Sequence, residues 1–156
     1  MIPIVILKAL DGIDIPIYGK GDNIRDWLFV DDHIDALFSV INKGSIGENY
    51  CIGGNNEKTN FEIAKTICYW LDKKLPQKDS YQNQIKFVED RPGHDKRYAI
   101  DSSKIKEELG WKPKYTFDNA IIKTLEWYLK NRDWCKKVSQ NSNYGGERIG
   151  IINPIN

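Results

Sequence analysis

The stretch from Asp90 to Ile100, DRPGHDKRYAI, constrains the fold most, because it forces a sharp turn between two apolar runs that resemble β-strands. Pro92 has no backbone N–H to donate, and Gly93 tolerates a positive φ. We therefore expect the chain to turn here and to expose Arg91 and His94.

The same stretch carries arginines that suit an anionic ligand. Arg91 and Arg97 can each hold a phosphate or carboxylate with two hydrogen bonds, and Arg25 lies upstream in GKGDNIRDW. A small anion is therefore one interpretation. The alternative, which the residues favour equally, is that Asp90 and Asp95 simply pair with these arginines on a solvated loop.

Composition gives no general attraction to large anions or to membranes. The chain has 156 residues, with 23 Lys and Arg against 22 Asp and Glu, so its net charge of +1 argues against nucleic-acid or membrane-surface partners. The three cysteines follow no metal-binding spacing, which predicts reduced thiols and a cytoplasmic protein. The apolar opening, residues 1–10, lacks a basic start and predicts a buried helix rather than a signal peptide.

Short strands and amphipathic helices alternate along the chain, which predicts a mixed α/β fold. A prominent helix follows Asp31 and Asp32, either of which can cap it. On that helix Ile34, Leu37, Phe38 and Ile41 recur at helical spacing and predict one buried face. We expect strands at residues 13–18, 25–30, 48–52, 85–88 and 97–100, and helices at residues 1–10, 31–44, 59–75, 102–110 and from residue 116 onward.

Four residues at the start of that helix resemble a list of metal ligands, namely Asp31, Asp32, His33 and Asp35. Adjacent residues of a helix do not face one point, so capping and surface charge explain them better and we predict no metal site. We also expect the end of the chain, residues 135–156, to form a poorly ordered tail after a first region at residues 1–134.

Two further features bear on ligand binding. Thr59 and Glu62 form a capping box, which places Asn60 in the first helical turn beside free backbone N–H groups, a position that suits an anion. A plain asparagine at a helix start is the competing interpretation. Gly19 and Gly21 could cradle a phosphate, but a lone GxG is weak evidence. These residues predict an anion site of Arg25, Asn60 and Arg91 and identify no catalytic residue.

Several segments, taken together, carry a family resemblance: IYGKGDNIRDWLFVDDH, ENYCIGGNNEKTN, DRPGHDKRYAID and ELGWKPKYTFDNAIIKTLEWYL. In this order and with these gaps they resemble the C-terminal portion of the dTDP-glucose 4,6-dehydratases, which are extended short-chain dehydrogenase/reductases. The resemblance covers residues 1–134. Related sugar epimerases share the RDWLFVDD-like and RPG elements but usually lack the His-Asp-x-Arg-Tyr continuation.

The resemblance implies a substrate-binding subdomain with a few elements that would complete a Rossmann domain. The family removes water from dTDP-glucose with NAD, giving a 4-keto-6-deoxy sugar used for rhamnose and related deoxysugars. By the resemblance, Arg25 holds the pyrophosphate and Asn60 contacts the nucleotide. Two segments complete the implied dTDP-sugar site: Pro16, Ile17 and Tyr18 line its pocket, and Asp90, Arg91, Pro92, Gly93 and His94 form a closing loop.

The resemblance also implies what other parts of the family supply. The GxxGxxG loop for NAD and the YxxxK catalytic pair belong to a region before the segments matched here, so we expect neither in this chain, no NAD on this chain alone, and no catalysis. The same logic leaves apolar faces of residues 25–52 uncovered, which favours a homo-oligomer, possibly domain-swapped, or a separate N-terminal half. Competing interpretations are a non-catalytic interaction module and a fragment of a UDP-sugar dehydratase.

Overall fold

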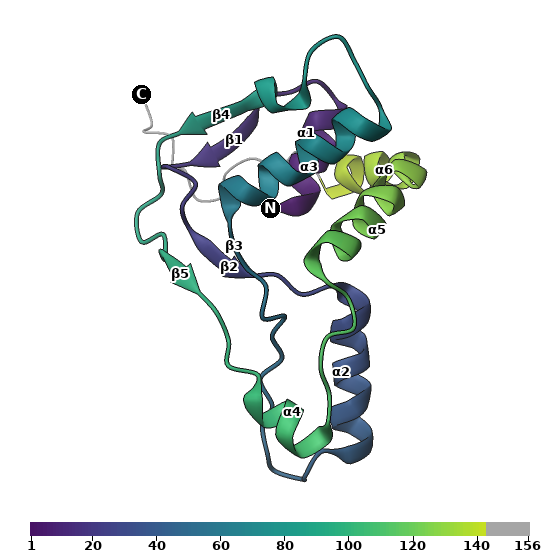
Figure 1. Ribbon diagram of the computed structural model, residues 1–156. Coiled ribbons are helices and arrows are strands. Elements are labelled where there is room, and N and C mark those ends of the chain that lie inside the picture. The colour runs from purple at the N-terminus through teal and green to yellow at the C-terminus, as the bar shows by residue number, and fades with distance from the viewer. Residues whose placement is uncertain (143–156) are drawn as a thin grey trace.

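A computed structural model describes residues 1–142 as a mixed α/β structure (Figure 1). The helices are α1 (Ile2–Leu10), α2 (Val30–Lys43), α3 (Asn60–Lys74), α4 (Ser103–Leu109), α5 (Phe117–Lys130) and α6 (Arg132–Ser142). The strands are β1 (Ile15–Tyr18), β2 (Ile24–Asp26), β3 (Glu57–Thr59), β4 (Ile85–Val88) and β5 (Arg97–Tyr98), and a 3-10 turn spans Tyr81–Gln84.

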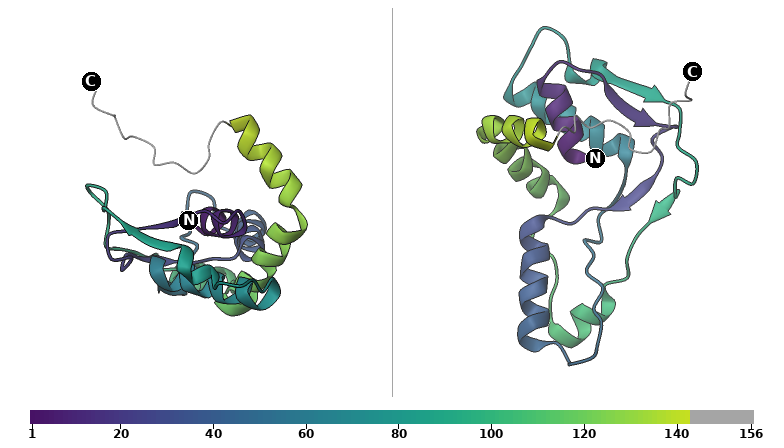
Figure 2. Two further views of the ribbon diagram at one scale, coloured as in Figure 1. Left: turned by 90° about the horizontal axis from the view of Figure 1, so that it is seen from above. Right: turned by 180° about the vertical axis from the view of Figure 1, so that it is seen from behind.

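The main core lies in the upper part of the molecule, where α1, α3 and α5 pack with β1 (Figures 1 and 2). Helix α3 begins at a complete capping box, in which Thr59 and Glu62 each bond the other's backbone N–H, as the sequence predicts. Ile63, Ile67 and Leu71, one or two turns apart, are fully buried. Each such side chain contributes about 1.5–3 kcal/mol by leaving water, so α3 is the central element of this core.

The strands form two small sheets. β1 pairs in parallel with β4, with Ile15 opposite Ile85 and Tyr18 opposite Val88. β2 lies in the middle of the other sheet, antiparallel to β3 and parallel to β5. β4 and β5 therefore belong to different sheets, and the segment between them, which carries the DRPGH loop, connects the two sheets.

A narrower lower extension consists of α2, α4 and the irregular residues 44–56 (Figure 1). Its small core contains Ala36, Ile105, Leu109 and Trp111. The carboxylate of Asp32 is 1% exposed and accepts the backbone N–H groups of Lys114 and Tyr115. Asp32 therefore ties α2 to the segment before α5.

The predicted buried face of α2 is wrong. Ile34, Leu37, Phe38 and Ile41 are 46%, 45%, 60% and 77% exposed. The helix buries Asp32 and Ala36 instead, and a residue two positions along a helix points about 200° away. The expectation from the resemblance, that apolar faces in residues 25–52 are uncovered, is confirmed at this helix.

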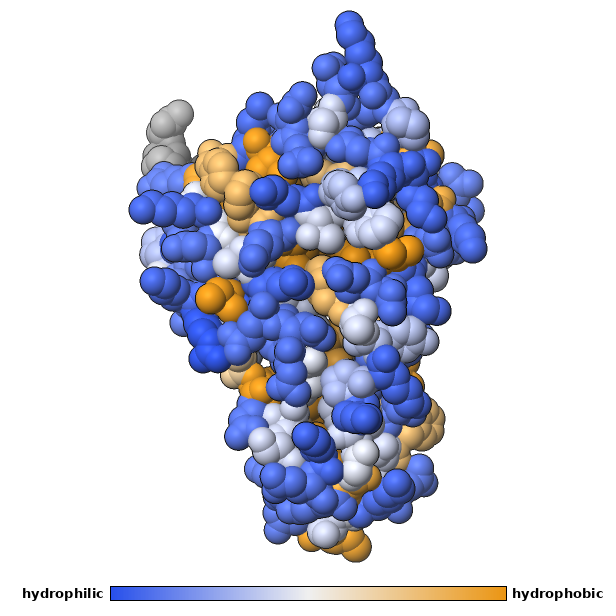
Figure 3. Space-filling view, in the orientation of Figure 1, coloured by the Kyte–Doolittle hydropathy of each residue, from blue (hydrophilic) through white to orange (hydrophobic). Residues whose placement is uncertain are grey.

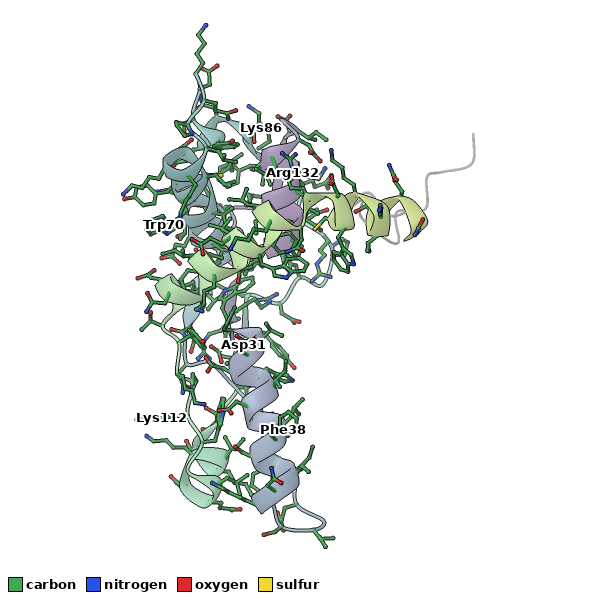
Figure 4. All side chains as sticks on the ribbon, turned by 90° about the vertical axis from the view of Figure 1, so that its right-hand side faces the viewer. Asp31, Phe38, Trp70, Lys86, Lys112 and Arg132 are labelled. Carbon is green, nitrogen blue, oxygen red and sulfur yellow. The ribbon has the colours of Figure 1, made fainter. Side chains whose placement is uncertain are left out.

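We call the exposed side chains of Val30, Ile34, Leu37, Phe38 and Ile41 the α2 apolar face. Figure 4 views the molecule from the side on which α2 lies, with Phe38 and Asp31 labelled along it. In Figure 3 the surface is largely hydrophilic, and hydrophobic side chains appear at the edge and tip of the lower extension.

Other sequence expectations differ from the structure at element ends. The strand predicted at residues 25–30 is only Ile24–Asp26, and Val30 already begins α2, whose N-cap is Phe29 and not an aspartate. Residues 48–52 form no strand, since no described segment pairs with them. The tail boundary at residue 135 falls inside α6, so residues 135–142 are helical, whereas residues 143–156 lie outside the described residues.

The first helix, α1, buries Val5, Ile6 and Ala9, which confirms the predicted buried helix at the start of the sequence. None of the helices among residues 1–142 has the length and apolar character to cross a bilayer.

Candidate nucleotide-sugar site

The β1 and β4 ends bring two predicted site segments together. Tyr18 is the partner of Val88, and the next residue, Gly19, donates its backbone N–H to the Val88 carbonyl at 2.9 Å. Pro16, in the same strand, has no N–H, and β4 is the one strand that pairs with β1 among residues 1–142. The predicted pocket segment 16–18 therefore lies beside β4, the strand that leads into the DRPGH loop.

Other segments of the protein pack closely against the glycine turn after β1. Gly19 and Gly21 have φ values of +56° and +72°. A Cβ on Gly19 would lie 2.9 Å from the Asp90 carboxylate, and a Cβ on Gly21 would lie 2.6 Å from Ile17 and 2.9 Å from Phe61. The glycines therefore allow protein segments to approach one another, and they do not frame an open phosphate cradle.

Arg25 lies in β2 and points to the end of the DRPGH loop. Its guanidinium donates to the carbonyl of Ile24 at 2.6 Å and to the carbonyl of Asp95 at 3.0 Å. Strand β5, which follows the loop, pairs with β2 and places Tyr98 opposite Arg25. The structure thus brings the predicted residue Arg25 against the predicted loop.

Asn60 is the first residue of α3 and lies beside the same turn. Its backbone N–H donates to the Asn23 carbonyl at 3.0 Å, and the N–H of Phe61 donates to Gly21 at 3.0 Å. The N–H of Glu62 is held by the Thr59 hydroxyl. The expectation of free N–H groups at this helix start is therefore wrong, because the fold uses them internally, and a ligand contact by Asn60 falls to its side chain.

The DRPGH loop is held by a pair of its own side chains. Asp90 Oδ1 lies 2.7 Å from His94 Nδ1 and accepts the backbone N–H of Arg91 at 2.8 Å. Hydrogen bonding from His94 lowers the pKa of Asp90 below its usual value, and the Arg91 N–H acts in the same direction. Gly93 adopts a φ of +67°, which confirms the predicted turn at Pro92 and Gly93.

The two titratable groups predicted to be exposed in this turn behave differently. Arg91 is exposed as predicted, but the His94 side chain is only 8% exposed because it packs beside Asp90. Arg97 forms a two-point ion pair with Glu57, at 2.7 and 2.6 Å. Within residues 1–142 no salt bridge joins the Arg91 guanidinium to a carboxylate, although its charge helps to lower the pKa of the neighbouring Asp90. Arg91 is therefore the loop arginine available to an anion.

One tyrosine and one lysine do have the YxxxK spacing, contrary to the expectation that the chain holds no such pair. Tyr69 and Lys73 lie in α3, where the Lys73 ammonium stacks 4.4 Å from the Tyr69 ring centre. Tyr69 lies nine positions after Asn60, or about 13 Å along the helix. The pair is a half-exposed helix-surface stack and does not join the candidate site.

No group of three or more His, Cys, Asp or Glu side chains in the described part of the chain could hold a metal ion. The acidic residues near His33 have protein partners, since Asp32 binds backbone N–H groups and Asp35 lies 2.8 Å from the Lys114 ammonium. The described cysteines, at positions 51, 68 and 135, are free thiols.

A groove of about 730 Å³ lies apart from these residues, between the start of α2 and α5. Ile2, Phe29, Val30 and Trp127 are among its lining residues, and no residue of the predicted site takes part. Sequence reasoning missed it because its walls come from segments far apart in the chain. It adjoins the α2 apolar face through Val30.

Comparisons with known proteins agree on a group of sugar-nucleotide enzymes. A family model described as GDP-mannose 4,6 dehydratase matches residues 1–124. The dTDP-glucose 4,6-dehydratase of Shigella flexneri is 56% identical over 142 residues, which are 91% of this chain and 39% of that protein.

Solved structures give the same picture. The dTDP-glucose 4,6-dehydratase of Bacillus anthracis, in complex with NAD, aligns with a TM-score of 0.77 and 46% identity over 88% of this chain and 41% of that one. The UDP-glucose 4-epimerase of Thermotoga maritima, with UDP-glucose, aligns with a TM-score of 0.71 and 26% identity over 84% of this chain and 40% of that one. The chain therefore spans about two fifths of the length of these relatives.

Proposed function

This chain belongs to the GDP-mannose 4,6 dehydratase family and corresponds to part of a dTDP-glucose 4,6-dehydratase, and on that premise we propose that it forms the portion that binds the nucleotide sugar. The ligand is dTDP-glucose, and the reaction of the whole enzyme is the NAD-dependent loss of water in cytoplasmic deoxysugar synthesis.

The observation that carries this proposal is the convergence of the predicted residues. Pairing of β1 with β4 places segment 16–18 beside the strand that enters the DRPGH loop, and pairing of β2 with β5 places Arg25 beside the strand that leaves it. Asn60 lies next to them because its backbone N–H donates to the Asn23 carbonyl. In the proposed site, segment 16–18 lines the nucleotide pocket and Arg25 binds the pyrophosphate. Arg91 closes over it, because the residue is exposed and forms no salt bridge among residues 1–142.

We assign no catalytic residue to this chain, and we propose that it neither holds NAD nor dehydrates the sugar on its own. The complex with NAD is that of the Bacillus anthracis enzyme. In this sequence no GxxGxxG pattern occurs, and the glycine turn at residues 19–21 is filled by Asp90, Ile17 and Phe61. An assay for the 4-keto sugar is expected to be negative with this chain and positive when a separate N-terminal half is added. Product from this chain alone would overturn the proposal.

The binding proposal is tested by a thermal-shift titration with dTDP, with UDP and GDP as controls. A ligand at 100 times its Kd adds about 2.7 kcal/mol to the stability of the folded chain, which raises Tm by several degrees. We expect dTDP alone to give this shift. A response to UDP instead would favour a UDP-sugar dehydratase, and a folded chain indifferent to every nucleotide would favour the interaction module.

Arg91→Ala and Arg97→Ala make a matched pair for the same titration. Both residues are exposed arginines of one segment, but Arg97 is engaged with Glu57. Loss of one charge-assisted contact costs about 1.5–3 kcal/mol of binding free energy, or roughly tenfold or more in Kd. We expect that loss for Arg91→Ala and little change for Arg97→Ala, and equal effects would contradict the assignment of Arg91.

We also propose that the α2 apolar face binds a second copy of this chain. Val30, Ile34, Leu37 and Ile41 are spaced by alternating steps of four and three, which is the pattern of a two-helix seam. The first turn of α2 carries Asp31 and its last turn carries Lys43. Antiparallel packing of two copies would bring these opposite charges together and would use one self-complementary patch, as a two-fold dimer requires.

Light scattering at micromolar concentration tests this dimer. Leu37→Asp with Ile41→Asp places charges in the seam and is expected to give a monomer. Trp134→Asp changes another exposed aromatic residue, 55% exposed, and is expected to leave the dimer intact. A monomeric parent chain would contradict the proposal and would direct attention to a separate N-terminal half as the occupant of this face.

A further inference from the structure

Asn23 is a buried polar residue in the turn between β1 and β2, and the family resemblance gives it no role. It is 4% exposed. Its position immediately precedes β2, the central strand of the second sheet. Most buried polar side chains are fully hydrogen-bonded, so each one that is not calls for a physical account.

The contacts of Asn23 join three segments of the proposed site. Its backbone carbonyl accepts the N–H of Asn60 at 3.0 Å, which fixes the start of α3. Its side-chain Nδ2 donates to the carbonyl of Asp95 at 3.3 Å, at the end of the DRPGH loop. The guanidinium of Arg25 donates to that same Asp95 carbonyl at 3.0 Å. Asn23 therefore contacts the start of α3 and shares the Asp95 carbonyl with Arg25, the residue proposed to bind the pyrophosphate.

Backbone pairing extends this connection. The N–H of Ile24 donates to the carbonyl of Lys96 at 2.7 Å, directly beside the contact made by Asn23. The loop is thus held at Asp95 and Lys96 by the turn, and at its other end by the bond from Gly19 to Val88. Of the hydrogen bonds that hold the two ends of the loop, the one from Asn23 comes from a side chain, whereas those at Gly19 and Lys96 join backbone atoms.

The side-chain amide of Asn23 is only partly hydrogen-bonded. Its Oδ1 is buried and has no hydrogen-bond partner among the described residues. An unpaired buried acceptor destabilises a fold, and an apolar side chain of the same size would avoid that cost. The residue therefore leaves one polar atom unpaired, while its donor bonds to the end of the DRPGH loop.

We propose that Asn23 is a positioning residue that sets the place of the DRPGH loop relative to Arg25 and Asn60. The inference rests on the proposed nucleotide-sugar site. Asn23 does not touch the ligand, since its side chain is buried. It acts through the Asp95 carbonyl, which both Asn23 and Arg25 hold, and so fixes the separation between the arginine of β2 and Arg91 in the loop.

The test compares Asn23→Leu, close in size and without polar atoms, with Asn83→Leu, a control at an exposed position outside these contacts. Three quantities are measured on the full chain: the thermal midpoint, hydrogen exchange of residues 90–98 without ligand, and the Kd for dTDP by calorimetry. A purely structural asparagine would change the midpoint and leave exchange and Kd, measured well below that midpoint, unchanged.

For Asn23→Leu we expect an equal or higher midpoint, severalfold faster exchange in residues 90–98, and a Kd for dTDP weakened about fivefold or more, as expected for one lost hydrogen bond. Asn83→Leu should match the parent chain in exchange and in Kd. Unchanged exchange together with unchanged Kd in Asn23→Leu would overturn the proposal.

Failure of the proposed function can be distinguished from failure of the positioning role of Asn23. If the parent chain does not bind dTDP, the proposed function fails, and the exchange of residues 90–98 alone decides the role of Asn23. If Asn23→Leu does not fold, Asn23→Asp takes its place, because it keeps the size and removes the Nδ2 donor to Asp95. Exchange equal to the parent in a folded Asn23→Asp would also refute the positioning role.

Discussion

Asp32 links distant parts of the chain through a single carboxylate. Both of its oxygens accept backbone N–H groups, from Lys114 at 2.9 Å and from Tyr115 at 3.2 Å, in a site that is 1% exposed. The neighbouring Asp31 is exposed. The sequence shows two adjacent aspartates at a helix start, and their difference arises only when the segment before α5 folds back onto one of them.

Asp32→Ala is therefore expected to lower the free energy of unfolding by about 3 kcal/mol, because two backbone donors lose their charged acceptor. Asp31→Ala is the matched control and should change it by less than about 0.5 kcal/mol. Urea unfolding of the two variants measures the difference. Similar losses for both would show that Asp32 acts as a surface charge.

The bond between Asp90 and His94 predicts a dependence on pH. Because the pKa of Asp90 is lowered in the folded chain, chiefly by His94, its contribution to stability is fully present above the unfolded value of about 3.9 and disappears as the pH falls through the lower folded value. Titration of the Asp90 carboxyl by NMR should give a depressed pKa, which His94→Ala should raise. An Asp90 pKa that His94→Ala leaves in place would refute this coupling.

At the scale of single elements, helix starts follow directly from the sequence. The capping box of α3 and the Thr116 cap of α5 are both local patterns, and both are present in the structure. The ends of β2 could not be predicted in the same way. A strand extends only as far as its partners, and β3 and β5 pair with residues 24–26 and not with the apolar run that follows.

The two helix caps are expected to differ in strength. Thr59 accepts the N–H of Glu62 at 3.1 Å and is bonded in return, whereas Thr116 accepts the N–H of Asn119 at 3.4 Å without a reciprocal partner. Thr59→Ala should lower the free energy of unfolding by about 1–2 kcal/mol, and Thr116→Ala by about half as much. Thermal and urea unfolding of each variant measure the loss, and a larger loss at Thr116 would contradict this ranking.

At the scale of the whole molecule, the fold has one large and one small core. Among residues 1–142 most buried apolar residues belong to the upper part, and the small core of the lower extension contains Ala36, Ile105, Leu109 and Trp111. Local opening is easiest where few apolar contacts are lost. Hydrogen exchange is therefore expected to be faster in α4 than in α3. Equal rates would show that the two cores unfold as one unit.

The sequence predicts the α/β class, the main helices and the DRPGH turn, because these depend on local patterns. It assigns the wrong side of α2 to the core. Periodicity shows that one face of a helix is apolar, but it does not show whether another part of the chain covers that face. For the site, Arg91 and the turn were accessible from residue type, and their roles from resemblance. The contacts of Asn23 were not, because they depend on strands paired across a long stretch of chain.

The pairing of β1 with β4 also governs the order in which the chain can fold. The contact between the consecutive helices α5 and α6 is local in sequence, whereas Tyr18 and Val88 are far apart along the chain, and parallel pairs of high contact order form slowly. On the ribosome, β1 emerges first and waits for β4. The strands that carry the proposed nucleotide-sugar site are therefore expected to pair late, after the helices, so that a nascent or partly refolded chain forms its helical core before the proposed site is complete.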